Sequence, residues 1–269
     1  MTWASVRGAS VAQGDSMPTI LAIGVLAYVG ETVGHELLGH GGVCLLDGGR
    51  ITALAPLWMR CSVHTIPMVV AGPAFNFAVG GFCAAILRLR VRSDALGYFL
   101  WLSCGFNLLI ACGYLIVGGA TTFGDWGVVF ASVQPQWAWR LVLAAVGLAG
   151  YLVTLETLAT LYQRLTGARG FEGDALRRRT LAPGAGAAAV ACAADGAGGH
   201  PAVGSLALAL GCTLFVGWTL SRIGNFSPPS TRSDTTELVI PFRPLWIAAA
   251  ILVAGFFVGV VGPIAFQAR

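Results

Sequence analysis

Long apolar runs separated by short polar segments dominate the pattern of this chain. The runs cover residues 19–46, 68–87, 96–119, 137–162, 181–220 and 245–266. An α-helix needs about 20 mostly apolar residues to cross a bilayer. The run 181–220 is too long for one helix and is broken by the polar stretch 195–201, so we expect two short or tilted helices there. The pattern predicts an all-α polytopic membrane protein with about six to seven transmembrane helices.

One short segment departs from the helical pattern. After the first apolar run, Asp47-Gly48-Gly49-Arg50 has the composition of a turn, and residues 51–61 alternate loosely between apolar and polar side chains. Such a turn followed by alternation predicts a short β-hairpin. The segment 1–18 is interpreted as a tail before a mature first helix, because no small-residue cleavage pattern closes the apolar run.

The composition agrees with a membrane protein. Of the 269 residues, 56% are hydrophobic and 10% are charged, and the mean hydropathy is +0.77. We therefore expect an integral membrane protein, with the lipid bilayer as its solvent. All sixteen basic residues are Arg, and Ala and Gly are abundant, which is typical of a GC-rich bacterial genome, so we expect a bacterial inner membrane. The seven cysteines lie mostly in apolar runs and form no CxxC pair, so they are interpreted as small core residues.

The positive charges indicate topology. All basic residues are Arg, and the net charge is +4. Arg88, Arg90 and Arg92 flank one loop, and Arg164, Arg169 and 177–179 flank another, so both loops are expected on the cytoplasmic side. The end of the first helix and the 121–125 loop would then share the opposite face. Because positive-inside topology accounts for the Arg residues, the net charge does not indicate a nucleic-acid partner.

Four ionisable residues lie within ten positions of the first predicted helix: Glu31, His35, Glu36 and His40. Ionisable side chains inside a membrane are costly and usually face a cavity or a partner. On a regular α-helix the two histidines would project about 140° apart, because each residue turns the helix by about 100°. A π-bulge, for which Gly39 is a suitable place, would absorb the additional residue and bring both rings onto one face.

Two resemblances support a metal site in this segment. The hexapeptide His35-Glu-Leu-Leu-Gly-His40 is identical to the string that marks the dipeptidyl peptidase III family, in which both histidines bind zinc. More broadly, residues 19–130 resemble the site-2 protease family of intramembrane zinc metalloproteases. The shared order of parts is a histidine pair on an early helix, a Gly-rich hairpin, a GPxxN helix start at Gly72 to Asn76, and a later helix ending at Asp125.

The resemblance divides the chain into a tail (1–18), a metalloprotease-like membrane core (19–130) and additional transmembrane helices (131–269) with a polar loop at 221–243. The chain departs from the family in three respects: HExxxH replaces HExxH, and Gly-Asp-Trp replaces the usual Asp-Gly dipeptide. In addition, the Arg residues put the site on the non-cytoplasmic side, whereas the proteases of this family generally cut near the cytoplasm.

The resemblance implies a Zn²⁺ ion held by His35, His40 and Asp125, which leaves the open position that catalytic zinc requires. Glu36 would be the general base, and Asn76 would orient the substrate backbone. Glu31 lies one turn before His35, so its side chain would either hydrogen-bond a ligand imidazole or only face a polar crevice. Asp47 and Gly48 match the Asp-Gly dipeptide that supplies a ligand in the family, but we expect Asp47 to form the hairpin turn.

Three functions remain open from the sequence. The first is a zinc metalloendopeptidase that hydrolyses a peptide bond of a membrane-protein substrate in or near the bilayer. The second is a non-proteolytic relative that serves as a structural or regulatory subunit of a membrane complex. The third is a di-iron oxidase using Glu31, His35, Glu36 and His40, but such a site needs a second helix with similar ligands.

Overall fold

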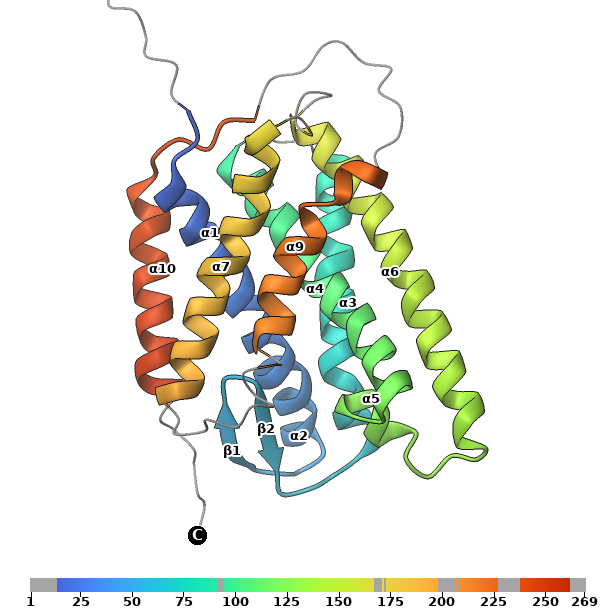
Figure 1. The fold of residues 1–269 in the computed structure, drawn as a ribbon. Coiled ribbons are helices and arrows are strands. Elements are labelled where there is room, and N and C mark those ends of the chain that lie inside the picture. Colours follow the sequence, from blue (N-terminus) through green and yellow to red (C-terminus); the bar gives the residue numbers. More distant parts are fainter. Residues whose placement is uncertain are drawn as a thin grey trace, which may run out of the picture.

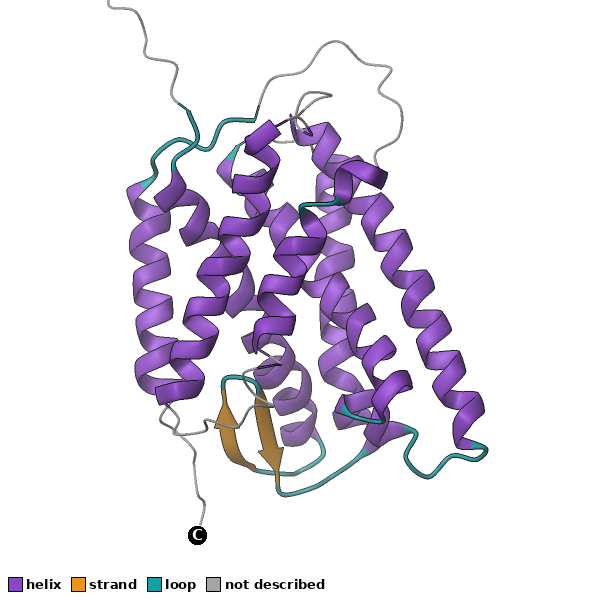
Figure 2. Cartoon of the chain, in the orientation of Figure 1, coloured by secondary structure: helices purple, strands orange, loops and turns teal. Residues whose placement is uncertain are grey.

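A bundle of long helices carries a small hairpin at one end (Figures 1 and 2). The computed structural model describes residues 14–90, 94–166, 171, 173–197, 207, 209–226 and 238–261. In these ranges, five helical segments are long and apolar enough to cross a membrane. They are Met17–Leu46, α3 (Ile66–Leu89), α4 (Ala95–Thr121), α6 (Gln136–Thr166) and Pro244–Val261. The predicted all-α polytopic architecture with a hairpin after the first helix is confirmed.

The first span contains three consecutive elements: α1 (Met17–Val33), the π-helical turn η1 (Gly34–Gly41) and α2 (Gly42–Leu46). The last span continues from α10 (Pro244–Phe256) into η5 (Phe257–Val261). A short helix, α5 (Gly124–Val129), follows α4. Together these elements carry the chain back and forth between the two ends of the bundle.

The region 181–220 contains two helices, as predicted. α7 (Gly173–Ala197) runs in one direction, and the apolar helix Gly211–Leu220, made of η3 (Gly211–Phe215) and α9 (Val216–Leu220), returns beside it (Figure 1). Most of the predicted break lies outside the described residues. α7 begins before the apolar run. Its first turns carry the exposed side chains of Arg177 and Arg178 and lie at the end of the bundle. A short 3₁₀ turn, η4 (Ile223–Phe226), follows α9.

The hairpin predicted in residues 51–61 is confirmed. Its strands, β1 (Ile51–Ala55) and β2 (Trp58–Cys61), pair antiparallel, and Ala55 lies opposite Trp58. Gly48 has a φ of 75°, a conformation that side chains with a Cβ rarely adopt, and it turns the chain out of α2. Asp47 lies on this turn, which joins α2 to β1, whereas the turn of the hairpin itself is formed by residues 56–57. Asp47 accepts a hydrogen bond from Thr65 Oγ1 at 2.5 Å.

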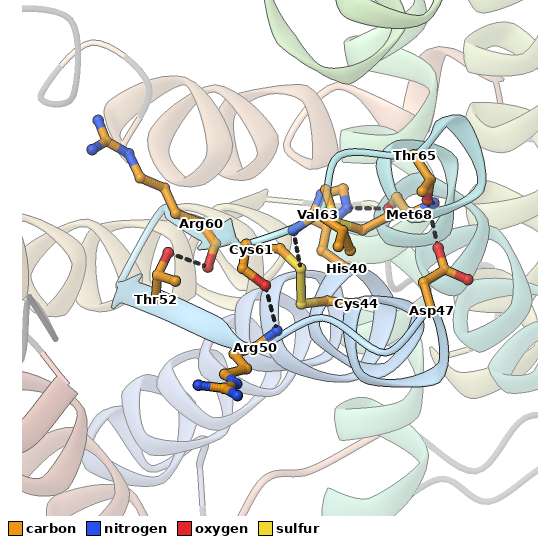
Figure 3. Close-up of a disulfide and its surroundings, with 11 residues drawn as sticks. His40, Cys44, Asp47, Arg50, Thr52, Arg60, Cys61, Val63, Thr65 and Met68 are labelled. Atoms are coloured by element: carbon orange, nitrogen blue, oxygen red, sulfur yellow. Dashed lines mark hydrogen bonds between the residues drawn. A yellow bond between two sulfur atoms is a disulfide. The ribbon is translucent and has the colours of Figure 1, made fainter. Parts of the chain in front are cut away.

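The interpretation of all seven cysteines as core residues is wrong for two of them. Cys44 of α2 and Cys61 of β2 form a disulfide (Figure 3). The hairpin brings Cys61 back beside the helix that precedes it, so two residues 17 positions apart in sequence have Cα atoms 6.0 Å apart. Apolar periodicity carries no information about this contact, because it arises only when the hairpin folds back.

The core of the bundle surrounds α4, which packs against α1, α3 and α6. Tyr98, Trp101 and Phe106 of α4 are fully buried, and Trp101 Nε1 donates a hydrogen bond to the Leu158 carbonyl of α6 at 3.0 Å. α10 exposes large apolar side chains instead, for example Leu245 and Leu252. Extended apolar surfaces of this kind mark membrane or protein contacts, which agrees with an integral membrane protein.

Candidate metal centre

The five-residue interval between His35 and His40 is accommodated by η1. A π-helical turn contains one residue more than an α-helical turn, so positions five apart come onto one face. The His35 and His40 rings lie edge to face with centroids 4.7 Å apart, and their Nε2 atoms are 3.1 Å apart. The predicted local departure from α-helix is confirmed, and it extends over Gly34–Gly41 rather than over a single residue.

Asp125 reaches the two histidines from another part of the chain. α4 ends in a sharp turn in which Thr122 (φ 62°) and Gly124 (φ 78°) adopt left-handed backbone conformations. The turn leads into α5, whose first-turn carboxylate faces both rings. Asp125 Oδ2 lies 3.3 Å from His35 Nε2, and Oδ1 lies 3.5 Å from His40 Nε2. The structure thus brings together the three residues that the sequence proposed as ligands.

The spacing of these atoms suits a small tetrahedral cation. Nitrogen and oxygen ligands about 2.0–2.2 Å from a tetrahedral ion lie about 3.3–3.6 Å from one another. The three distances of 3.1, 3.3 and 3.5 Å are close to that range. Burial opposes ionisation of Asp125, but hydrogen bonding to His35 and His40 lowers the pKa of its carboxyl group to about 2. The residues therefore fit a divalent cation with two nitrogen ligands and one anionic oxygen ligand.

The orientation of His40 is set by the start of α3. His40 Nδ1 donates a hydrogen bond to the Met68 carbonyl at 2.8 Å (Figure 3), so in the neutral ring Nε2 carries the lone pair. Thr65 caps α3 by accepting from the Met68 amide at 3.3 Å and donates its own hydroxyl proton to Asp47. This chain of contacts fixes one candidate ligand through groups that the sequence did not identify.

Gly72 leaves open the space in front of both imidazoles. A Cβ atom at this position would lie 2.7 Å from His35 Nε2 and still closer to His40 Nε2. The point that such a Cβ would occupy is therefore near both nitrogens, where an ion would have to lie. The Gly-Pro pattern at this position was visible in the sequence, but the reason for the glycine was not.

Glu36 lies beside the histidines in the buried interior. One carboxylate oxygen of Glu36 and one ring nitrogen from each of His35 and His40 lie within 4.8 Å of one another. Glu36 also lines a small cavity with Glu31, His35, Tyr114 and Cys212. A carboxylate in this place can accept a proton from a water molecule near the two rings, or it can itself contact a cation.

The structure does not contain the predicted hydrogen bond between a candidate ligand imidazole and Glu31. Glu31 instead accepts hydrogen bonds from Asn76 Nδ2 at 2.8 Å and Thr32 Oγ1 at 3.1 Å. His35 Nδ1 is buried and has no hydrogen-bond partner. Asn76 comes from α3 and faces Glu31 across the helix contact, so the two predicted accessory residues bind each other.

Tyr114 and Cys212 are site residues that sequence reasoning missed. The Tyr114 ring of α4 stacks on His35, with centroids 5.3 Å apart and an interplanar angle of 26°. Cys212 reaches the same cavity from η3. Both residues lie within ordinary apolar runs, and no local motif distinguishes them from lipid-facing neighbours.

Within the described ranges, the group around His35, Glu36 and His40 is the one cluster of three or more His, Cys, Asp or Glu side chains suited to a metal ion. A di-iron site would need a second helix with similar carboxylate and imidazole ligands, and among the described residues the added carboxylate is that of Asp125. The described residues could hold one metal ion. Comparisons with family models, with curated proteins and with solved structures gave no match.

Proposed function

We propose that this protein is a membrane-embedded zinc metallopeptidase of the site-2 type, which hydrolyses a peptide bond of a membrane protein in or near the bilayer. The observation that carries the proposal is the convergence of His35 Nε2, His40 Nε2 and the Asp125 carboxylate at the spacing of ligands around one ion. The adjacent Glu36 supplies the acid–base group that such a reaction needs.

Each part of the site has a role in this reaction. Zinc, when bound by His35, His40 and Asp125, polarises a carbonyl group and lowers the pKa of water to about 7. Glu36 accepts a proton from the attacking water, whose oxygen bonds to the peptide carbonyl carbon. Glu36 then returns the proton to the amide nitrogen as the C–N bond breaks.

Burial supports this chemistry. The side chains of His35 and His40 are only 4% and 8% exposed, whereas that of Asp125 is 20% exposed. A site that is largely closed to bulk water strengthens the attraction between ligands and cation. We infer that a substrate approaches from the side of Asp125 and α5.

Replacing Glu36 tests the catalytic role. Glu36→Gln keeps the size of the side chain but removes its ability to accept the proton, so hydrolysis should fall by at least about 100-fold. Purified variants in liposomes would be assayed with a panel of quenched fluorescent transmembrane peptides, and bound metal would be measured by mass spectrometry. Glu156→Gln, on the exposed face of α6, is the matched control and should leave hydrolysis unchanged.

The same measurements separate Glu36 from Asp125 as the third ligand. Glu36→Gln should retain zinc, whereas Asp125→Asn and His35→Ala should lose it; His64→Ala, at an exposed position, is the histidine control. Loss of zinc from Glu36→Gln with retention in Asp125→Asn would reverse the assignment. If Glu36→Gln retains zinc and neither the unchanged protein nor this variant hydrolyses any peptide, the result would favour the alternative function, a non-proteolytic subunit of a membrane complex.

A further inference from the structure

The two ends of the bundle differ in positive charge. α3 starts beside the hairpin and ends at the far end, α6 ends there, and α7 and α10 start there (Figure 1). The Arg residues in the described part of that far end are Arg88, Arg90, Arg164, Arg177, Arg178, Arg179, Arg222 and Arg243. The hairpin end carries Arg50, Arg60 and Arg140. Because positive charge accumulates on the cytoplasmic side of membrane proteins, this distribution favours a cytoplasmic position for the far end.

The disulfide gives an independent indication of the same topology. Cys44 lies one helical turn after His40, and Cys61 lies on the hairpin, so the bond belongs to the end that carries the metal centre (Figure 3). Disulfides form and persist in oxidising compartments and are rare in the reducing cytosol. Cys83, Cys104 and Cys112, by contrast, are free and buried between helices.

The metal centre is also shallow with respect to that end. His40 precedes Leu46, the last residue of the first span, by six positions, which corresponds to roughly 9 Å along a helix. Asp125 lies on α5, outside the spans, and is the most exposed of the three candidate ligands. The centre therefore opens toward the end with the hairpin rather than toward the Arg-rich end.

From these observations we infer that the metal centre opens on the oxidising, non-cytoplasmic face of the membrane. Insofar as it concerns substrates, the inference rests on the proposed function. The substrates are then segments of membrane proteins that lie at that face. The Cys44–Cys61 disulfide forms in this compartment and fastens the hairpin to the helix that carries His35 and His40.

Thiol labelling of the full chain in intact cells tests the inference. His64→Cys and Asp174→Cys introduce thiols at exposed positions of the hairpin end and the Arg-rich end, respectively. A membrane-impermeant maleimide should label His64→Cys in intact cells and Asp174→Cys only after the membrane is permeabilised. Both variants must label in detergent, and the unchanged chain reports background. The reverse pattern in intact cells would overturn the inference.

The disulfide is measured separately, without an added cysteine. Membranes quenched in acid are alkylated, reduced and then treated with a maleimide-polyethylene glycol tag that shifts mobility on a gel. The unchanged chain should gain two tags and the double variant Cys44→Ser/Cys61→Ser none; an untagged wild-type chain would contradict an oxidising location.

Neither readout depends on catalysis. If the protein hydrolyses peptides but His64→Cys is labelled only after permeabilisation, the inference is refuted and the proposed function is not. If His64→Cys is labelled in intact cells but the protein hydrolyses no peptide, the inference is supported and the peptidase function is refuted.

Discussion

At the scale of single residues, the candidate centre depends both on the side chains that could bind an ion and on a glycine that leaves the space between them empty. His35 and His40 direct their Nε2 atoms toward a common point, and Gly72 of α3 keeps that point free of side-chain atoms. The Met68 carbonyl holds the His40 ring. A backbone carbonyl and a missing Cβ have no signature in a sequence motif, because their effect depends on a neighbouring helix.

Gly72→Ala should therefore abolish metal binding or weaken it at least about tenfold, comparable to the loss when a supporting group of a metal ligand is removed. The added methyl group would contact both imidazole nitrogens. Gly81→Ala on the same helix is the control, because its Cβ would meet nothing within 4 Å. Zinc titration of both purified variants by calorimetry measures the difference; equal affinities would refute this account of Gly72.

At the scale of elements, the π-helical turn η1 and α3 form the contact that assembles the site. Gly39 permits their close approach, since a Cβ at this position would lie 2.7 Å from Gly72 Cα and 2.9 Å from the Ala71 carbonyl oxygen. The interval between the histidines, together with Gly39, predicted a departure from α-helix in the first span. Its extent over a full turn, and its partner α3, required the folded structure.

A substitution that pushes η1 away from α3 should lower both the thermal stability of the protein and its zinc content. Gly39→Ala adds a methyl group against backbone atoms that cannot move aside easily, and overpacking of this kind costs about 1–3 kcal/mol. Gly42→Ala, in the next helical turn, meets nothing within 4 Å and should be nearly neutral. Thermal unfolding in detergent and zinc content would be compared; a stable, zinc-loaded Gly39→Ala protein would show that the contact is adjustable.

At the scale of the whole molecule, a buried ion pair joins distant parts of the chain at the Arg-rich end. Arg179 of α7 donates two hydrogen bonds to Asp15, at 2.8 and 3.0 Å, and both side chains are 5% exposed. Asp15 also accepts from the Ile240 amide at 3.0 Å. The segments before α1 and α10 are thereby held against α7, so the helices after residue 130 are part of the same bundle as the candidate site.

Removing one partner of this pair should destabilise the whole bundle. Arg179→Met leaves the Asp15 carboxylate buried without its counter-charge, which costs about 3–5 kcal/mol. Arg178→Met, at the neighbouring exposed position, should change the free energy of unfolding by less than about 0.5 kcal/mol. Denaturant unfolding in detergent measures both, and the double variant Asp15→Asn/Arg179→Met should recover part of the loss.

The sequence by itself determined the membrane character, the hairpin after the first span and the candidate residues of the centre. Apolar length and turn composition are local properties, and the interval between His35 and His40 required a helical irregularity if both rings were to share a cation. The residues that resemble a known family pointed to Asp125 before any distance was available. The membrane helices and the hairpin are confirmed because each depends on residues that are close in sequence. The metal-binding role of the three candidate ligands, which lie together in the structure, stays a prediction.

Only the tertiary structure decided which groups surround the histidines. The Asn76–Glu31 hydrogen bond, the Tyr114 ring against His35, and the Cys44–Cys61 disulfide all join separate elements. Each depends on how helices cross and how the hairpin folds back, and apolar periodicity is the same for many such arrangements. The candidate ligands could thus be proposed from the sequence, whereas the groups that support them and the space in front of them arise from packing between helices.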